Sequence, residues 1–144
     1  MELFLESDFM VYGAKEPLTQ AEALARFDHM LAFSDELPFA KQVIIERSTG
    51  CKLGYAGADE FMFRDEKRLE FGYRLVGESR GLGYATEASL ALLDVARSVW
   101  HGELLAFIDP ENGSSRKVLD KIGFEFMENI NMDGGNAELY GLFI

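Results

Sequence analysis

The chain has 144 residues, the size of one ordinary domain, so we expect a single domain over residues 1–144. Hydrophobic residues make up 48% of it and charged residues 27%, with 12 phenylalanines, which excludes a disordered chain and predicts a core rich in aromatic side chains. The net charge of -11 disfavours nucleic acid and anionic membrane as partners. It favours a cationic substrate, or it serves solubility alone.

Membrane insertion and secretion are not expected from this sequence. No apolar stretch approaches the ~20 residues of a bilayer span, and the start MELFLESDF lacks the basic region of a signal peptide. We therefore expect a cytoplasmic protein. The single cysteine, Cys51, cannot form an internal disulfide and has no His or Cys near it in sequence. We interpret it as a structural thiol rather than a reactive one, and we expect no metal site.

The first half of the chain predicts one helix followed by strands. Thr19 and Glu22 form a capping box in front of a helix over residues 20 to 33, where apolar residues recur at helical spacing. KQVIIER and CKLGYAG predict two strands joined by a tight turn at Gly50. FMFRDEKRLEFGYRLV continues as a hairpin whose second arm runs from about residue 69 to 76.

The second half alternates helices and strands. ATEASLALLDVARSVW predicts a long helix with Ala88, Leu92, Val95 and Val99 on one apolar face. LLAFID predicts a strand, SRKVLDKI a helix ended by Gly123, and FEFMENI and AELYGLFI two final strands. This order predicts a mixed α/β, α+β-like fold with helices covering a largely antiparallel sheet.

A glycine-rich turn links a strand to the long helix. The run LVGESRGLGYATEA contains Gly77, Gly81 and Gly83, and Arg80 adds a positive charge beside the helix start. Free N–H groups and the helix dipole favour a phosphate at such a position, although a plain strand-to-helix turn would have the same glycines. The run has neither the Lys-Ser or Lys-Thr of a P-loop nor the distant acidic residue of a dinucleotide-binding unit.

A second motif follows the predicted strand LLAFID. In IDPENGSSRKVLDKIGFEF, Asn112 can cap the next helix or face a ligand, and Ser115, Arg116 and Lys117 open that helix. Together, ESRGLGYATEA and NGSSRKVLDKIGFEF resemble the GNAT superfamily of N-acyltransferases, and with LEFGYRL they resemble its RimJ/RimL-type branch of ribosomal-protein N-terminal acetyltransferases. The resemblance covers roughly residues 40 to 144.

The resemblance implies the GNAT fold, a central twisted sheet flanked by helices, and acetyl-CoA as the acyl donor. Arg80, Gly83 and Ala85 occupy the positions of the pyrophosphate loop, and Asn112 resembles the residue that binds the pantetheine arm. A backbone amide at Val76 or its neighbour is expected near the acyl group. The full set of expected cofactor-binding residues is Val76, Arg80, Gly81, Gly83, Tyr84, Ala85, Thr86, Asn112, Ser115 and Lys117.

The resemblance also supplies catalytic candidates. Glu70 matches an acidic residue that serves as general base, although a solvent-facing strand position explains a glutamate as well. Many relatives carry a tyrosine as general acid where this chain has Leu119; Ser115 matches the serine that RimL-like relatives offer instead, and it can equally be a capping residue. Tyr73, Phe107, Phe124 and Tyr140 are interpreted as core or pocket walls, and His29 and His101 are not catalytic candidates.

The expected function is acetyl transfer to a primary amine, either a protein N-terminus or a small molecule, by direct attack in a ternary complex. A non-catalytic acyl-CoA-binding module is the alternative, and an enzyme for longer acyl-CoA is a third possibility. The start LFLESDFMVYG resembles the end of the first helix of such relatives, so their first strand is expected to be missing. An exposed sheet edge would then favour a homodimer.

Overall fold

The computed structural model describes residues 18–132 and 135–144. The elements, in chain order, are α1 (Gln20–Ser34), β1 (Gln42–Ile45), β2 (Lys52–Phe63), β3 (Glu66–Leu75), the short 3-10 helix η2 (Gly77–Ser79), α2 (Tyr84–Val99), β4 (Glu103–Ile108), α3 (Gly113–Ile122), β5 (Glu125–Met132) and β6 (Gly135–Phe143). This is the predicted order of helices and strands. The expectation of a missing first strand falls on residues 1–17, outside the described residues.

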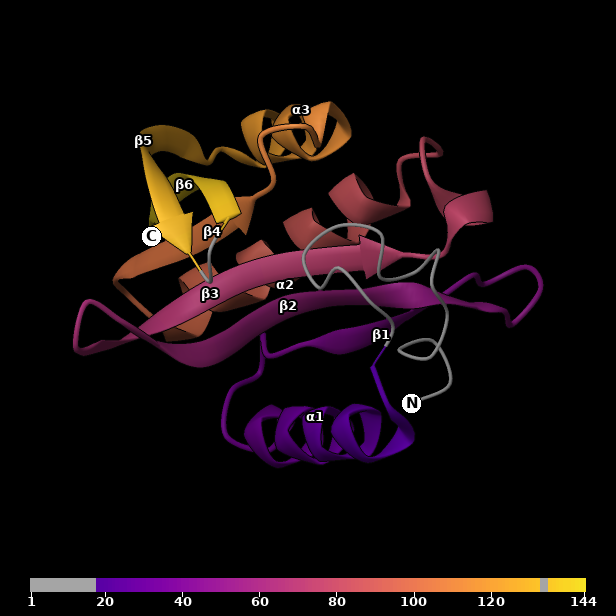
Figure 1. Ribbon diagram of the computed structural model, residues 1–144. Helices are drawn as coiled ribbons and strands as arrows, with labels where there is room; N and C mark the ends of the chain where they lie inside the picture. The colour runs from indigo at the N-terminus through magenta and orange to yellow at the C-terminus, as the bar shows by residue number, and fades with distance from the viewer. Residues whose placement is uncertain (1–17, 133–134) are drawn as a thin grey trace.

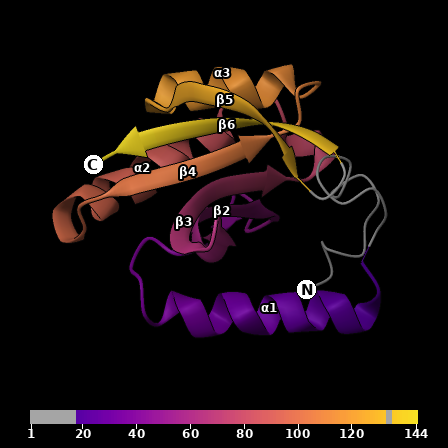
Figure 2. The same cartoon turned by 60° about the vertical axis from the view of Figure 1, so that its left-hand side comes forward.

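The strands form one six-stranded sheet in the order β1-β2-β3-β4-β6-β5. All neighbours are antiparallel except β3 and β4, which are parallel, so the mixed, largely antiparallel sheet is confirmed. Helix α1 covers one side of this sheet, while α2 and α3 lie on the other side (Figures 1 and 2). None of the helices in the described ranges is both long and apolar enough to cross a membrane.

Short-range signals set the element boundaries. The Thr19 hydroxyl accepts from the Glu22 N–H while the Glu22 carboxylate accepts from the Thr19 N–H, so the capping box is present. Gly50 turns β1 into β2 with a φ of 76°. Gly123 ends α3 in the left-handed conformation, with a φ of 95°. Each of these positions behaves as its local sequence predicts.

The buried face of α2 differs from the predicted one. Its buried residues are Ala85, Ser89, Leu93 and Ala96, whereas Val95 and Val99 are exposed. The helix is apolar around a wide arc, so hydrophobicity alone did not identify the strip that packs against the sheet. Three of the four buried residues, Ala85, Ser89 and Ala96, are small, and Leu93 is the large one.

The main core lies between the sheet and helices α2 and α3. Its largest fully buried members include Phe39, Phe71, Leu93 and Leu104, and the Phe71 and Phe124 rings pack with centroids 6.0 Å apart. The aromatic core is thus confirmed. The burial on which the interpretation of Cys51 as a structural thiol rested is wrong, because Cys51 lies exposed in the turn before β2.

Candidate active site

A cavity of about 340 Å³ opens where β3 and β4 separate. The two strands pair only at Leu69 with Leu104 and at Glu70 with Leu105, and then diverge toward their C-terminal ends (Figure 1). Residues 71–75 of β3 form one wall of the cavity and residues 106–109 form the other. The opening is thus made by the backbone of the sheet itself.

Helix α2 begins at one end of this cavity. Gly81 and Gly83 have φ values of 76° and 90°, and a Cβ added to either would meet no atom within 4 Å. Gly83 is the N-cap and offers no side chain to the first N–H groups of the helix. Arg80, which lines the cavity, donates from Nε to the Leu75 carbonyl at 3.1 Å. This loop therefore has the open space and the donors that a phosphate group requires.

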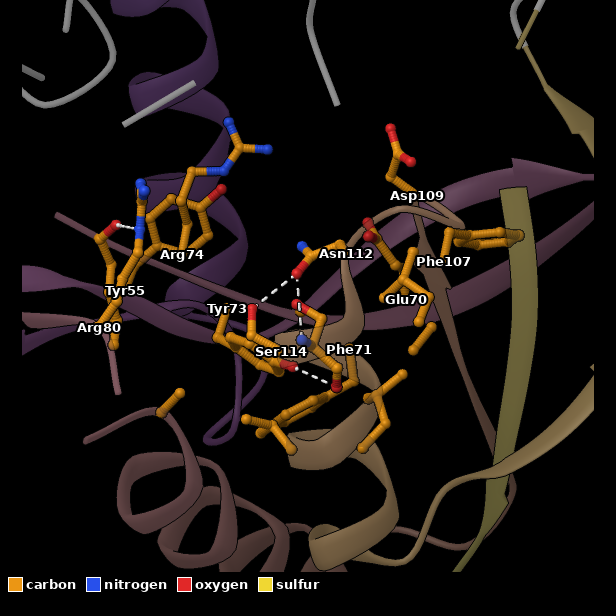
Figure 3. Close-up of a pocket in the computed structure, with 18 of the residues that line it drawn as sticks. Tyr55, Glu70, Phe71, Tyr73, Arg74, Arg80, Phe107, Asp109, Asn112 and Ser114 are labelled. Carbon is orange, nitrogen blue, oxygen red and sulfur yellow. Dashed lines mark hydrogen bonds between the residues drawn. The ribbon is translucent and has the colours of Figure 1, made fainter. Parts of the chain in front are cut away.

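The N-terminus of α3 forms the opposite wall. Asn112 is its buried N-cap, and its Oδ1 accepts from the Ser115 N–H at 3.1 Å and from the Ser114 hydroxyl at 2.8 Å. The capping role of Asn112 is confirmed. Its amide nitrogen points away from the helix into the cavity (Figure 3), so a ligand role remains a prediction for that half of the side chain.

Tyr73 crosses the cavity from β3 to α3. Its phenol donates to the backbone carbonyl of Ser115 at 3.1 Å. Burial raises the pKa of Tyr73 to about 12, and the hydrogen bond to Ser115 opposes that rise. This contact was missed from sequence, where Tyr73 was interpreted as packing, because nothing local indicates that β3 faces α3.

The backbone of Val76 is not the donor that was expected at the acyl site. Its N–H donates to the Leu53 carbonyl of β2 at 2.8 Å, within the sheet. Because an antiparallel ladder alternates, the N–H groups of its neighbour Leu75 and of Tyr73 point the other way, toward the space between β3 and β4. Both residues line the cavity. Of Val76 and Leu75, only Leu75 has an N–H that faces the cavity, and a role of this N–H at the acyl group stays a prediction.

Glu70 lies on the wall of the cavity and faces a buried lysine. The Lys41 side chain is only 5% exposed and donates to Asp59 Oδ2 at 3.2 Å, while Glu70 Oε2 is 3.8 Å away. His29 Nε2 lies 2.9 Å from the other Asp59 oxygen. The Glu60 N–H also donates to Asp59 Oδ1, so Asp59 has three partners, whereas Glu70 keeps acceptor capacity and is 32% exposed. Lys41 and Asp59 were not found from sequence.

Arginines gather at the other end of the cavity, where Arg74 and Arg80 lie beside Tyr55 (Figure 3). Burial is the main cause that lowers the pKa of Arg74. Repulsion from Arg26 and Arg80 adds to the lowering, while Tyr55 and Glu70 act in the opposite direction. Guanidinium groups from α1, β3 and the glycine loop therefore interact in one place.

Several expected site residues lie outside the cavity lining. The Tyr84 hydroxyl donates to Glu46, Thr86 is half-buried in the first turn of α2, and Lys117 is exposed on α3. Arg116 is held by Glu138 through two contacts of 2.7 Å. The lining does include six of the expected residues, namely Glu70, Arg80, Gly81, Ala85, Asn112 and Ser115, together with Leu75, the neighbour of Val76.

Comparison with protein families gives a match over most of the chain. The family described as "Acetyltransferase (GNAT) domain" matches residues 1–125. Among curated proteins, YkkB of Bacillus subtilis (strain 168), described as uncharacterized, is 34% identical over 86 residues, which cover 59% of this chain and 50% of that protein. The match thus spans about half the length of this curated relative.

Solved structures with a similar fold are also acetyltransferases. An acetyltransferase from Agrobacterium tumefaciens str. C58 is 26% identical, with a TM-score of 0.74 over 90% of this chain and 75% of that one. A phosphinothricin acetyltransferase from Sinorhizobium meliloti, solved with AcCoA, is 20% identical, with a TM-score of 0.76 over 99% and 80%. A ribosomal-protein-alanine N-acetyltransferase from Brucella melitensis is 19% identical, with a TM-score of 0.74 over 96% and 86%. The similarity to the last two proteins shows a shared fold only.

Proposed function

Because this chain belongs to the GNAT family of acetyltransferases, we propose that it transfers an acetyl group from acetyl-CoA to a primary amine within a ternary complex. The observation that carries the proposal is the early separation of β3 and β4 beside the glycine turn of α2. The cavity between the strands leads from a phosphate-binding helix end to a carboxylate. A thioester with a long phosphate-bearing arm fits that arrangement.

The glycine turn is the proposed site of the pyrophosphate. Gly81 and Gly83 leave open space beside the first N–H groups of α2, and Arg80 lies next to them. The amide nitrogen of Asn112 is proposed to donate to the arm that connects the phosphates to the thioester. Bound acetyl-CoA supplies an activated acetyl group and a thiolate leaving group.

Acetyl transfer then requires three further contributions from the chain. The C–N bond forms as the C–S bond breaks, and we assign Glu70 as the base that takes the amine proton, because its carboxylate faces the cavity with acceptor capacity remaining. The Leu75 N–H is proposed to polarise the acyl carbonyl. Ser115, on the opposite wall, is proposed to protonate the departing thiolate.

A non-catalytic acyl-CoA-binding module is the second candidate. The observation in its favour is Leu119, a buried aliphatic residue on the cavity wall where many relatives have an acidic tyrosine hydroxyl. Such a module would bind acetyl-CoA through the same loop and release no thiol. The RimJ/RimL-like branch, and with it a protein N-terminus as acceptor, rests on sequence motifs and is part of the proposal.

The test combines binding with turnover. Isothermal titration with acetyl-CoA should show binding to the wild-type protein, and Arg80→Glu should weaken it by roughly 10-fold or more because a charge-assisted contact becomes repulsive. Arg97→Glu, on the outer surface of α2 next to Asp94, is the matched control and should bind like wild type. Failure of the folded wild-type protein to bind would contradict the proposal.

Thiol release against a panel of primary amines then separates the two candidates. An enzyme releases coenzyme A with at least one amine, and Glu70→Gln should lower kcat by roughly 10²-fold or more without changing the KM for acetyl-CoA. Binding without thiol release for any amine would favour the binding module.

A further inference from the structure

The cavity has a different charge from the protein around it. Four basic residues line it, Arg26, Lys41, Arg74 and Arg80, against two acidic ones, Glu70 and Asp109. The whole chain, in contrast, has a net charge of -11. The sequence-based expectation of a cationic acceptor therefore does not apply to the cavity, whose positive residues have to be explained by its ligands.

Positively and negatively charged side chains lie in different parts of the cavity. Arg74 and Arg80 lie at one side with Tyr55, and Glu70 and Asp109 lie at the other, with Asn112 between them (Figure 3). Lys41 lies at the negative end, 3.8 Å from Glu70 Oε2, but its hydrogen bond goes to Asp59, so Glu70 keeps acceptor capacity for an amine. We infer that the acceptor is an amine that also carries an anionic group, with its nitrogen at Glu70 and its anion at Arg74 and Arg26. This inference rests on the proposed function.

The face of the sheet that holds Arg74 supports an acceptor rather than a cofactor site. Arg74 is directly opposite Tyr55 on β2, and Tyr55 packs against Ala23 of α1, so Arg74 lies on the α1 face. Leu75, the next residue, packs with Ala85 of α2 on the other face. Arg74 and Arg26 therefore approach the cavity from the side opposite to the glycine turn.

Glu70 and Arg74 share one face of β3 because they are four residues apart. Their Cα atoms are separated by about 13 Å. Between them lies Gly72, where an added Cβ would meet only Glu70 Oε1, at 3.5 Å. This gap leaves room for a short chain that joins an amine to an anion.

Arg26, Arg74 and Arg80 already have partners within the protein. A guanidinium has five N–H donors, so a ligand can add to these contacts. Repulsion between Arg74 and Arg26 also favours an anion between these two groups, because the anion offsets the cost of holding like charges together. An amino carboxylate is the simplest molecule that satisfies both ends of the cavity.

Isothermal titration with ω-amino carboxylates and their uncharged amides tests the inference without depending on turnover. γ-Aminobutyrate and γ-aminobutyramide form one matched pair, and ε-aminocaproate and its amide form a longer one. Each is titrated with and without saturating coenzyme A, so that failure of cofactor binding is recognised separately. We expect the carboxylate of at least one pair to bind wild-type protein roughly 10-fold or more tightly than its amide.

Two variants and one control locate the anion site. Arg74→Gln and Arg26→Gln should each reduce the preference for the carboxylate. Arg26 is an exposed helix residue, so its replacement should leave the fold intact. Arg97→Gln removes one arginine far from the cavity and should keep the preference. Equal or absent binding of both members of every pair would overturn the inference. So would an Arg74→Gln variant that weakens acetyl-CoA binding and leaves the carboxylate preference unchanged.

Discussion

The phenol of Tyr73 on β3 and the backbone carbonyl of Ser115 on α3 form a 3.1 Å hydrogen bond across the cavity. Burial raises the pKa of Tyr73 to about 12, so folding favours the neutral phenol. The stability that this group contributes is complete below pH 10, its ordinary pKa, and is lost as the pH rises toward 12. At neutral pH this neutral phenol connects β3 to α3.

Tyr73→Phe should lower the free energy of unfolding by about 1 kcal/mol, because the ring remains while the hydrogen bond is lost. Urea denaturation at pH 7 measures the change. In an alkaline absorbance titration, the variant should also lack the tyrosine that ionises near pH 12. Unchanged stability together with an unchanged titration curve would mean that the phenol is not held by Ser115.

Lys41→Met should destabilise the protein by about 3 kcal/mol, since it leaves Asp59 and Glu70 facing each other without a cation. These two carboxylate residues are direct partners across the β2–β3 ladder. Lys67→Met is the control, because Lys67 pairs with Glu60 while 71% exposed, and it should cost less than about 1 kcal/mol. Equal effects in chemical denaturation would contradict the buried role of Lys41.

Gly83→Ala should destabilise α2 by about 1–2 kcal/mol, because its φ of 90° is unfavourable for any residue with a Cβ. Gly113→Ala is the control. It also adds a Cβ in open space, but its φ lies outside the left-handed region, so stability should be equal or slightly higher. Thermal unfolding separates the two, and similar melting temperatures would show that Gly83 tolerates a side chain.

Glu138→Gln should lower the melting temperature at pH 7. Arg116 donates two hydrogen bonds to the Glu138 carboxylate, and these lower the pKa of Glu138 below 4.5. Folding therefore favours the ionised form, and its stabilisation is present above pH 4.5 and is lost as the pH falls through the lower folded-state pKa. The difference between variant and wild type should shrink across this range. A difference independent of pH would argue against an ionic contribution.

The fold was predictable where a few neighbouring residues determine the outcome. Thr19 and Glu22 satisfy each other's backbone, and Gly50 and Gly123 adopt conformations that glycine favours. The buried face of α2 was not predictable in this way. Its apolar arc is wider than the buried strip, and the sheet, which is formed by distant residues, decides which part is covered.

Only part of the candidate site was predictable from sequence, for the same reason. The glycine loop and Asn112 were found because each motif is continuous in sequence. Lys41, Asp59 and Glu70 come from a loop and two different strands, and only the β2–β3 register brings them together. The choice between Val76 and its neighbour could not be made from sequence for the same reason, since the phase of the backbone ladder depends on that register.

The parallel ladder between β3 and β4 has consequences beyond the space that it leaves. With only two residue pairs in that ladder, the sheet consists of two halves that are joined along a short seam and held from beneath by contacts such as Phe71 with Phe124. A ligand that bridges the seam should slow hydrogen exchange at amides on both sides and raise the melting temperature. Bound ligand should therefore make the two halves of the sheet behave as a more rigid unit than they do in the chain alone.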